Sequence, residues 1–190
     1  MQIWAGLGNP GASYALHRHN VGFMAADIIA EVHGFGPWQK KFRSLVAEGR
    51  IGRRKVLLLK PQTYMNDSGD AVQQALRFYK LDLDALTAFH DELDLAPMKV
   101  KVKIGGGTAG HNGLRSIDAC LGPEFRRVRI GIGHPGHKDR VTPYVLGNYA
   151  KSEMDVLADL LAAIAAEVDW LAAGDDPRFM SEVARRLQDD

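Results

Sequence analysis

The sequence predicts an α/β fold: a single domain in which helices flank a mixed, largely parallel, twisted sheet. Two observations lead to this prediction. Short apolar segments alternate along the chain with longer segments whose apolar residues recur at helical spacing, which is the order typical of strands joined by crossover helices. The 190 residues also fit one domain, 1–190, and contain no linker, low-complexity tract or true repeat.

Five segments are expected to form strands because they are short, apolar and rich in β-branched residues. They are residues 3–7, 55–60, 86–91, 100–104 and 128–133. The fourth, VKVKI, alternates strictly between apolar and lysine residues, which predicts a strand with one solvated face. Lys101 and Lys103 then point to the same side of that strand.

Helices are expected between and after these strands. The first covers 21–32, with Asn20 as a favourable N-cap, Gly34 as a stop, and an apolar face made of Met24, Ala25, Ile28, Ile29 and Val32. The others are expected at about 71–79, from Gly113 to Leu121, from a cap at Ser152 through residue 174, and at 179–187.

Composition and charge exclude several classes of protein. With 46% apolar and 25% charged residues the chain is typical of a globular protein. No apolar run approaches the roughly 18 residues of a membrane span, and the N-terminus lacks the sections of a signal peptide, so we expect a cytoplasmic protein without membrane contact. The single cysteine, Cys120, excludes an internal disulfide framework and is expected to be buried on a helix face.

The net charge of +1 is unevenly distributed. Basic residues cluster at 38–60, 98–103 and 126–140, whereas acidic residues concentrate after 150. Such a distribution is typical of a protein that holds an anionic partner on one face.

The stretch GLGNPG at 6–11 has the G-x-G-x-x-G spacing of a dinucleotide-binding loop. The same spacing recurs at 105–110 and 131–136, and the three segments cannot all hold a pyrophosphate. The residues after Gly11 show no helical stripe, although a dinucleotide loop needs a helix that opens at its third glycine. A nucleotide-dependent oxidoreductase is therefore the less favoured interpretation, and no nucleotide or other cofactor is expected.

Covalent and metal catalysis lack their usual motifs. No serine lies in a G-x-S-x-G context, and no H-E-x-x-H occurs. His134 and His137, in HPGH, have no carboxylate or cysteine partner at ligand spacing. We therefore expect neither a protein nucleophile nor a bound metal.

Polar side chains in turns after the predicted strands remain as candidates for chemistry. They are Asn9, Asn66, Asp91 and Asn112, and His19 lies at the start of the first predicted helix. A histidine base, an orienting carboxylate and amide donors suit general-base attack by water on a carbonyl. Each residue alone has a structural explanation, since Asn and Asp are common in turns, so the hypothesis depends on their co-occurrence.

Six motifs together carry a resemblance to a known family. They are GLGNPG, RHNVG (18–22), KPQTYMNDSG (60–69), HDELDL (90–95), GGGTAGHNGLRSI (105–117) and RIGIGHPG (129–136). Their order resembles that of bacterial-type peptidyl-tRNA hydrolase, from Ile3 to about Gly147. The resemblance implies a monomeric α/β enzyme that cleaves the ester joining a peptide to the terminal ribose of tRNA and so recycles peptidyl-tRNA. The alternative is an RNA-binding family member without hydrolase activity.

The same resemblance implies a role for individual residues. His19 corresponds to the catalytic base and Asp91 to its partner, while Asn9, Asn66 and Asn112 correspond to asparagines that line the pocket and serve in catalysis. The resemblance leaves open which asparagine supports the carbonyl and which binds peptide. Residues expected to contact the substrate are Tyr14 and Met65, with Asn66 and Asn112, and Lys103 and Arg129 as a clamp for the tRNA 5′-phosphate supported by Lys101.

Two positions depart from the family pattern. Position 17 is histidine where threonine is common, which makes His17 a possible rival base, and Thr108–Ala109 replaces a pair that usually contains histidine. Neither departure touches a residue proposed for catalysis.

Overall fold

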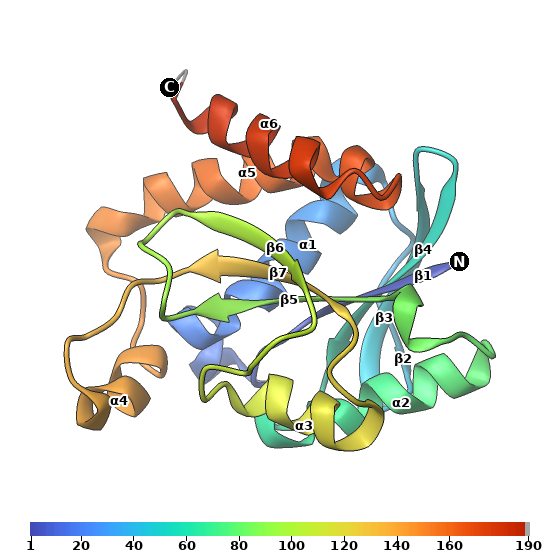
Figure 1. The fold of residues 1–190 in the computed structure, drawn as a ribbon, viewed down its shortest axis with the longest axis horizontal. Helices are drawn as coiled ribbons and strands as arrows, with labels where there is room; N and C mark the ends of the chain where they lie inside the picture. The colour runs from blue at the N-terminus through green and yellow to red at the C-terminus, as the bar shows by residue number, and fades with distance from the viewer. Residues whose placement is uncertain (189–190) are drawn as a thin grey trace.

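A twisted seven-stranded sheet forms the middle layer of the computed structural model, which describes residues 1–188 (Figure 1). Its strand order is β2-β3-β4-β1-β5-β7-β6. Strands β4, β1, β5 and β7 run parallel to their neighbours in this group, while β2, β3 and β6 add antiparallel pairs at the two edges. The predicted mixed, largely parallel sheet is thereby confirmed. The bounds are β1 Gln2–Gly6, β2 Gln39–Lys41, β3 Ser44–Ile51, β4 Arg54–Pro61, β5 Leu86–Glu92, β6 Val100–Ile104 and β7 Arg126–Gly131.

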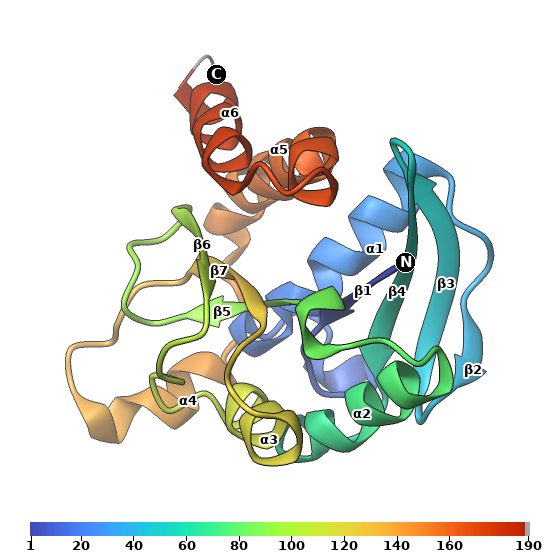
Figure 2. The same cartoon turned by 45° about the vertical axis from the view of Figure 1, so that its right-hand side comes forward.

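Helices cover both faces of the sheet. Figure 1 shows α5 and α6 with α1 on one side and α2 with α3 on the other, and the turned view in Figure 2 keeps this separation. The bounds are α1 Val21–His33, α2 Ser68–Phe78, α3 Asn112–Leu121, α4 Val141–Val145, α5 Met154–Ala172 and α6 Asp176–Gln188. Within residues 1–188, no helix is both long and apolar enough to cross a membrane.

Two hydrophobic clusters hold these layers together. Neighbouring residues of a strand point to opposite faces, so Trp4 of β1 enters the cluster under α1, α5 and α6, whereas Ile3 enters the cluster under α2 and α3. Leu58 and Leu57 of β4 divide in the same way. Because both faces of the central strands are buried, their sequences are continuous apolar runs, which made them recognisable.

The hairpin β2–β3 was not predicted. Strand β2, QKK, contains no apolar residue, and β3 is only partly buried. The connecting residues Phe42 and Arg43 both have positive φ, 55° and 52°, which is a hairpin-turn conformation usually marked by glycine or asparagine. The sequence therefore lacks both the apolar alternation and the turn residues that identify a hairpin.

Three local predictions were wrong. Ser152 does not cap α5 but lies inside a 3₁₀ turn, Lys151–Glu153, where the backbone N–H of Ala150 donates to Glu153 Oε1 at 2.8 Å. Cys120 is exposed, whereas the buried side chains of α3 include Leu114 and Ile117. Val32, at the end of α1, is 54% exposed.

The carboxyl ends of the parallel strands β1, β4, β5 and β7 meet at one edge of the sheet, where ligands bind in open α/β sheets. Asn112 reaches this edge by a different route from the one predicted. Strand β6 is antiparallel to β7, so it ends at the opposite edge. The loop 105–111 then runs back, and Arg127 Nη1 holds it by donating to the carbonyl of Gly107 at 2.7 Å.

Candidate active site

A cavity of about 300 Å³ lies at this carboxyl edge. It brings together side chains from six separate segments of the chain. The residues with polar groups in its lining include Asn9, His19, Asn66, Asp91, Glu92, His111, Asn112 and Thr142, and its apolar part includes Met65, Leu93, Val141, Val145 and Leu146. Of the residues predicted for catalysis, all five line this cavity.

His19 and Asp91 form a buried hydrogen-bonded pair at its base. His19 Nδ1 and Asp91 Oδ2 are 2.8 Å apart, and the two residues are 8% and 4% exposed. Burial lowers the pKa of His19, but the charge of Asp91 and its hydrogen bond outweigh this effect, so the pKa lies above its ordinary value. The carboxylate therefore restores the basicity that burial would remove.

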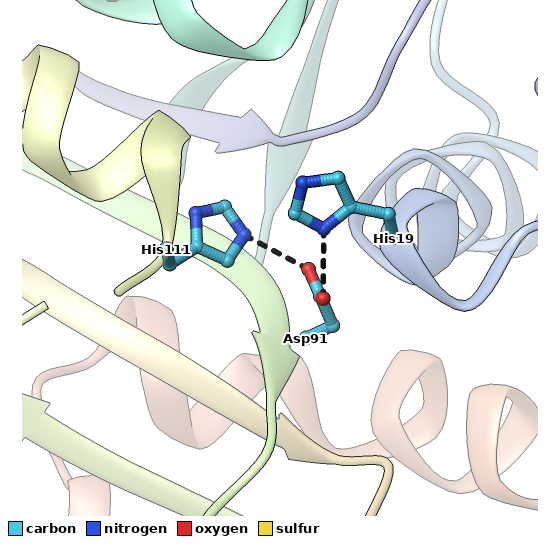
Figure 3. A group of neighbouring side chains, drawn as sticks. All are labelled: His19, Asp91 and His111. Carbon is cyan, nitrogen blue, oxygen red and sulfur yellow. Dashed lines mark hydrogen bonds and ion pairs between the residues drawn. The ribbon is translucent and has the colours of Figure 1, made fainter. Parts of the chain in front are cut away.

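His111 completes this pair, and sequence reasoning missed it. Its Nε2 lies 2.8 Å from Asp91 Oδ1, so Asp91 stands between two imidazoles (Figure 3). Its Nδ1 accepts hydrogen bonds from the backbone N–H groups of Gly113 and Leu114, which makes it the N-cap of α3. Histidine is not among the residues that identify an N-cap in a sequence, so its position before Asn112 gave no usable signal.

These contacts assign the protons of the site. Because Nδ1 of His111 accepts from two N–H groups, its proton must be on Nε2, which donates to Asp91. Burial alone would raise the pKa of Asp91. The electrostatic interactions and hydrogen bonds with His19 and His111 lower it by more than burial raises it, so Asp91 is ionised and accepts from both. His19 then carries its proton on Nδ1 and leaves Nε2 with a free lone pair.

The same three residues are close enough to be considered as a metal site, since one possible ligand atom of each lies within 4.8 Å of the others. The hydrogen bonds of His111 argue against it. A metal at Nε2 would displace the proton there while Nδ1 still accepts from the backbone, and the ring would have to become an imidazolate. The geometry thus fits a hydrogen-bonded chain rather than a ligand set.

Asn9 is held in one orientation. Asn20 does not cap α1 as predicted; its Oδ1 accepts from the backbone N–H of Asn9 and its Nδ2 donates to the carbonyl of Asn9, both at 2.9 Å. The side-chain Oδ1 of Asn9 accepts from the N–H of Met65 at 2.8 Å. Its Nδ2 is therefore the group that Asn9 can offer to a ligand in the cavity.

Two glycines, Gly6 and Gly22, allow β1, β5 and the start of α1 to lie close together. A Cβ at Gly6 would lie 2.2 Å from the carbonyl oxygen of Gly22, and a Cβ at Gly22 would lie 2.3 Å from that of Phe89. Only glycine at these positions lets the first turn of α1 approach β1 and β5. In GLGNPG, the first glycine thus serves the close contact that places His19 beside Asp91.

The other residues predicted to contact the substrate differ in their positions relative to the cavity. Asn66 and Asn112 are exposed residues of the lining, whereas Met65 is buried. Tyr14 does not line the cavity but packs edge-on against Tyr64, which does.

His17, the possible rival to His19, is also outside the lining. Its backbone forms a β-bridge with Asn148, and its ring packs edge-on against Tyr14. It therefore lies beyond the group of residues that surrounds Asp91.

The predicted cations share one face of the sheet. Lys101 pairs in register with Arg129, and Lys103 with Arg127. Arg129 is not a free cation, because its Nε donates to Glu92 Oε1 at 2.9 Å. Lys103 and Arg129 line a second cavity of about 240 Å³, and Glu92 contributes to the lining of both cavities.

Comparison with known proteins adds to this picture. The family model described as peptidyl-tRNA hydrolase matches residues 3–190. The peptidyl-tRNA hydrolase of Rhizorhabdus wittichii is 71% identical over 189 residues, covering 100% of both chains, and that of Novosphingobium aromaticivorans is 71% identical, covering 99% of this chain and 98% of its own. The crystal structure of the Acinetobacter baumannii enzyme superposes with a TM-score of 0.90 at 39% identity, covering 96% of this chain and 94% of that chain.

Proposed function

The chain belongs to the peptidyl-tRNA hydrolase family, and we propose that it uses His19 as a general base to hydrolyse the ester between a peptide and the 3′-terminal ribose of tRNA. The observation that carries this proposal is the chain His19–Asp91–His111, which leaves Nε2 of His19 with a free lone pair in a cavity that holds amide donors. A neutral imidazole in this state can take a proton from water as the water attacks the ester carbonyl.

Each group then has a place in the reaction. Water bonded to His19 Nε2 attacks the carbonyl carbon, the proton passes to His19, and the ionised Asp91 stabilises the imidazolium that forms. The carbonyl oxygen becomes negatively charged, and amide N–H groups such as Nδ2 of Asn9 stabilise it. His19 returns the proton to the departing ribose oxygen, which leaves free tRNA and a free peptide acid.

The alternative is a family member that binds RNA without hydrolysing it. The complete set of hydrogen bonds around Asp91 favours the hydrolase, since an inactive protein has no need for an ionised carboxylate buried between two histidines. Release of free tRNA from an N-acetylated aminoacyl-tRNA by the purified protein tests this directly. Binding of the substrate without release would support the alternative instead. We also propose that the protein is a monomer and lies in the cytoplasm.

Asn66 and Asn112 are expected to bind the substrate through their amides, since both are exposed in the lining of the cavity. Asn66→Ala and Asn112→Ala should each reduce kcat/KM by about 10–10³, the range expected for loss of one oriented donor. An amide that stabilises the developing oxyanion should affect mainly kcat, and one that binds the peptide mainly KM.

Gln39→Ala is the matched control, because Gln39 is an exposed amide side chain in the edge strand β2 and does not line the cavity. Its kinetic parameters should equal those of the wild type. If neither Asn66→Ala nor Asn112→Ala differed from this control, the substrate would have to bind elsewhere.

Lys103 and Arg129 are proposed to hold the 5′-phosphate of the tRNA, with Lys101 on the same face. Lys103→Gln should raise KM about tenfold at unchanged kcat, since one charge-assisted hydrogen bond to phosphate is lost. The increase should shrink when the substrate lacks its 5′-phosphate, and the wild-type KM should rise with salt concentration.

Lys103 is the better position for this test, because Arg129→Gln would also leave the buried Glu92 without its cation. Lys55→Gln provides a control, since Lys55 is exposed near the start of β4, which three strands separate from β6. Equal losses on substrates with and without the 5′-phosphate would show that Lys103 binds something else.

A further inference from the structure

One wall of the catalytic cavity has little structure of its own. This α4 wall, defined here as residues 141–149, contributes Val141, Thr142, Val145 and Leu146 to the lining. Helix α4 has only five residues, and a helix of that length is not stable by itself. In Figure 1 it lies beyond the arrowheads of β5 and β7, away from the two helical layers. Its position therefore depends on what anchors it.

The side chain of Arg18 contacts this wall at several points. Its Nη1 donates to the carbonyl of Asn148 at 3.0 Å and reaches that of Tyr144 at 3.5 Å, while Nη2 donates to Glu153 Oε1 at 3.1 Å. The guanidinium carbon lies 4.4 Å from the centre of the Tyr144 ring and 5.6 Å from that of Tyr149. The side chain is only 15% exposed.

Backbone contacts continue the attachment at Arg18 and at the residues before it. Its own N–H donates to the carbonyl of Gly147 at 3.0 Å, and the N–H of Tyr149 donates to the carbonyl of Leu16 at 3.0 Å. The segment that pairs with the wall therefore ends directly before His19. The wall and the base are attached to the same short stretch of chain.

We propose that Arg18 is a positioning residue that holds the α4 wall against the catalytic cavity, and that it thereby determines how well the enzyme binds substrates with a bulky apolar residue next to the ester. The inference rests on the proposed function. The lining side chains of the wall are mostly apolar, so an apolar residue of the peptide gains more from contact with them than glycine does.

The contacts require arginine in particular. A guanidinium is planar, stacks on aromatic rings and donates in several fixed directions at once, whereas the ammonium of lysine is a compact charge on a flexible stem. Arg18 uses all three properties, toward the two tyrosine rings, the carbonyls of the wall and Glu153. Lysine at this position can keep the ion pair but cannot reproduce the stacked, forked arrangement.

Arg18→Met tests the proposal with two substrates that differ at the esterified residue. KM for N-acetyl-phenylalanyl-tRNA should rise about tenfold, and KM for N-acetyl-glycyl-tRNA by less than about threefold, the scale of apolar contact energies. The kcat values should change little, because the Arg18 side chain donates to the wall and to Glu153 and not to His19 or Asp91. Arg18→Lys should recover only part of the loss. Amide exchange of Tyr149, measured by NMR or mass spectrometry, should become faster in Arg18→Met.

Arg186→Met is the matched control, because Arg186 pairs with Glu167 between α5 and α6, remote from the wall. It should change neither the ratio of the two KM values nor the exchange of Tyr149. Equal KM changes for the two substrates in Arg18→Met, or unchanged exchange of Tyr149, would overturn the inference. Failure of the proposed function itself is distinguishable, since the wild-type protein would then release tRNA from neither substrate.

Discussion

Replacing His19 by alanine should lower kcat by about 10²–10⁴, which is the usual contribution of a general base. The cavity would lose its free imidazole nitrogen, and within residues 1–188 no other histidine can replace it. The proton of His111 is held on Nε2 by the backbone contacts of its Nδ1. Burial lowers the pKa of His90 to about 3, and its Nδ1 is bonded to the carbonyl of Asp91.

The dependence of the wild-type rate on pH should follow the titration of His19. A general base must be neutral, so kcat/KM should fall as the pH drops through the pKa of His19. Because Asp91 raises this pKa above the ordinary value, the fall should begin at a higher pH than for a free histidine. In His19→Ala the remaining activity should lack this acid limb.

His17→Ala is the control for this experiment, because His17 lies two residues away but outside the lining of the cavity. It should retain most of the wild-type kcat. Release of tRNA from N-acetyl-aminoacyl-tRNA measures both variants, and circular dichroism checks their fold. A near-normal kcat in His19→Ala would contradict the assignment of the base.

The fold class was predictable because its strongest signals are local. Runs such as IWAGL in β1 and KVLLLK in β4 are apolar throughout, as strands buried on both faces must be. The hairpin β2–β3 lies at the sheet edge, where solvent exposure removes this signal. Its turn at Phe42–Arg43 adopts positive φ without the residues that predict it.

Several residues that line the cavity were predictable from the sequence, but their hydrogen-bond partners were less so. Asn9, His19 and Asp91 stood out as polar residues beside apolar segments. Asn20 binds Asn9 instead of capping α1. This choice depends on a contact between two segments eleven residues apart, and N-cap preferences do not describe such contacts. The pairing of Arg129 with Glu92 likewise depends on the register between β5 and β7. Such partners are set by tertiary packing.

Asp91→Asn should lower kcat by a factor in the same range as the loss of His19, about 10²–10⁴, as expected when a base is forced into the wrong tautomer. An asparagine has one accepting oxygen and one donating amide group, whereas Asp91 accepts from both His19 and His111. His111 cannot change its tautomer without breaking its bonds to Gly113 and Leu114. The amide oxygen at position 91 should therefore face His111.

The amide nitrogen at position 91 would then face Nδ1 of His19. That nitrogen has to become an acceptor, so the proton of His19 moves to Nε2 and the lone pair in the cavity is lost. Loss of the carboxylate also removes what raises the pKa of His19, so the acid limb of the remaining activity should move to lower pH.

A second substitution distinguishes this explanation from a simple loss of charge. In Asp91→Asn combined with His111→Asn, asparagine can still cap α3, but it no longer imposes a donor on position 91. The amide at position 91 is then free to turn its oxygen toward His19, which restores the proton to Nδ1. The double variant should therefore recover part of the rate lost through the wrong tautomer and exceed Asp91→Asn in kcat by about tenfold or more. The single variant His111→Asn should lose less than about tenfold in kcat. A double variant no faster than Asp91→Asn would show that the charge of Asp91, and not the proton position imposed by His111, controls the base.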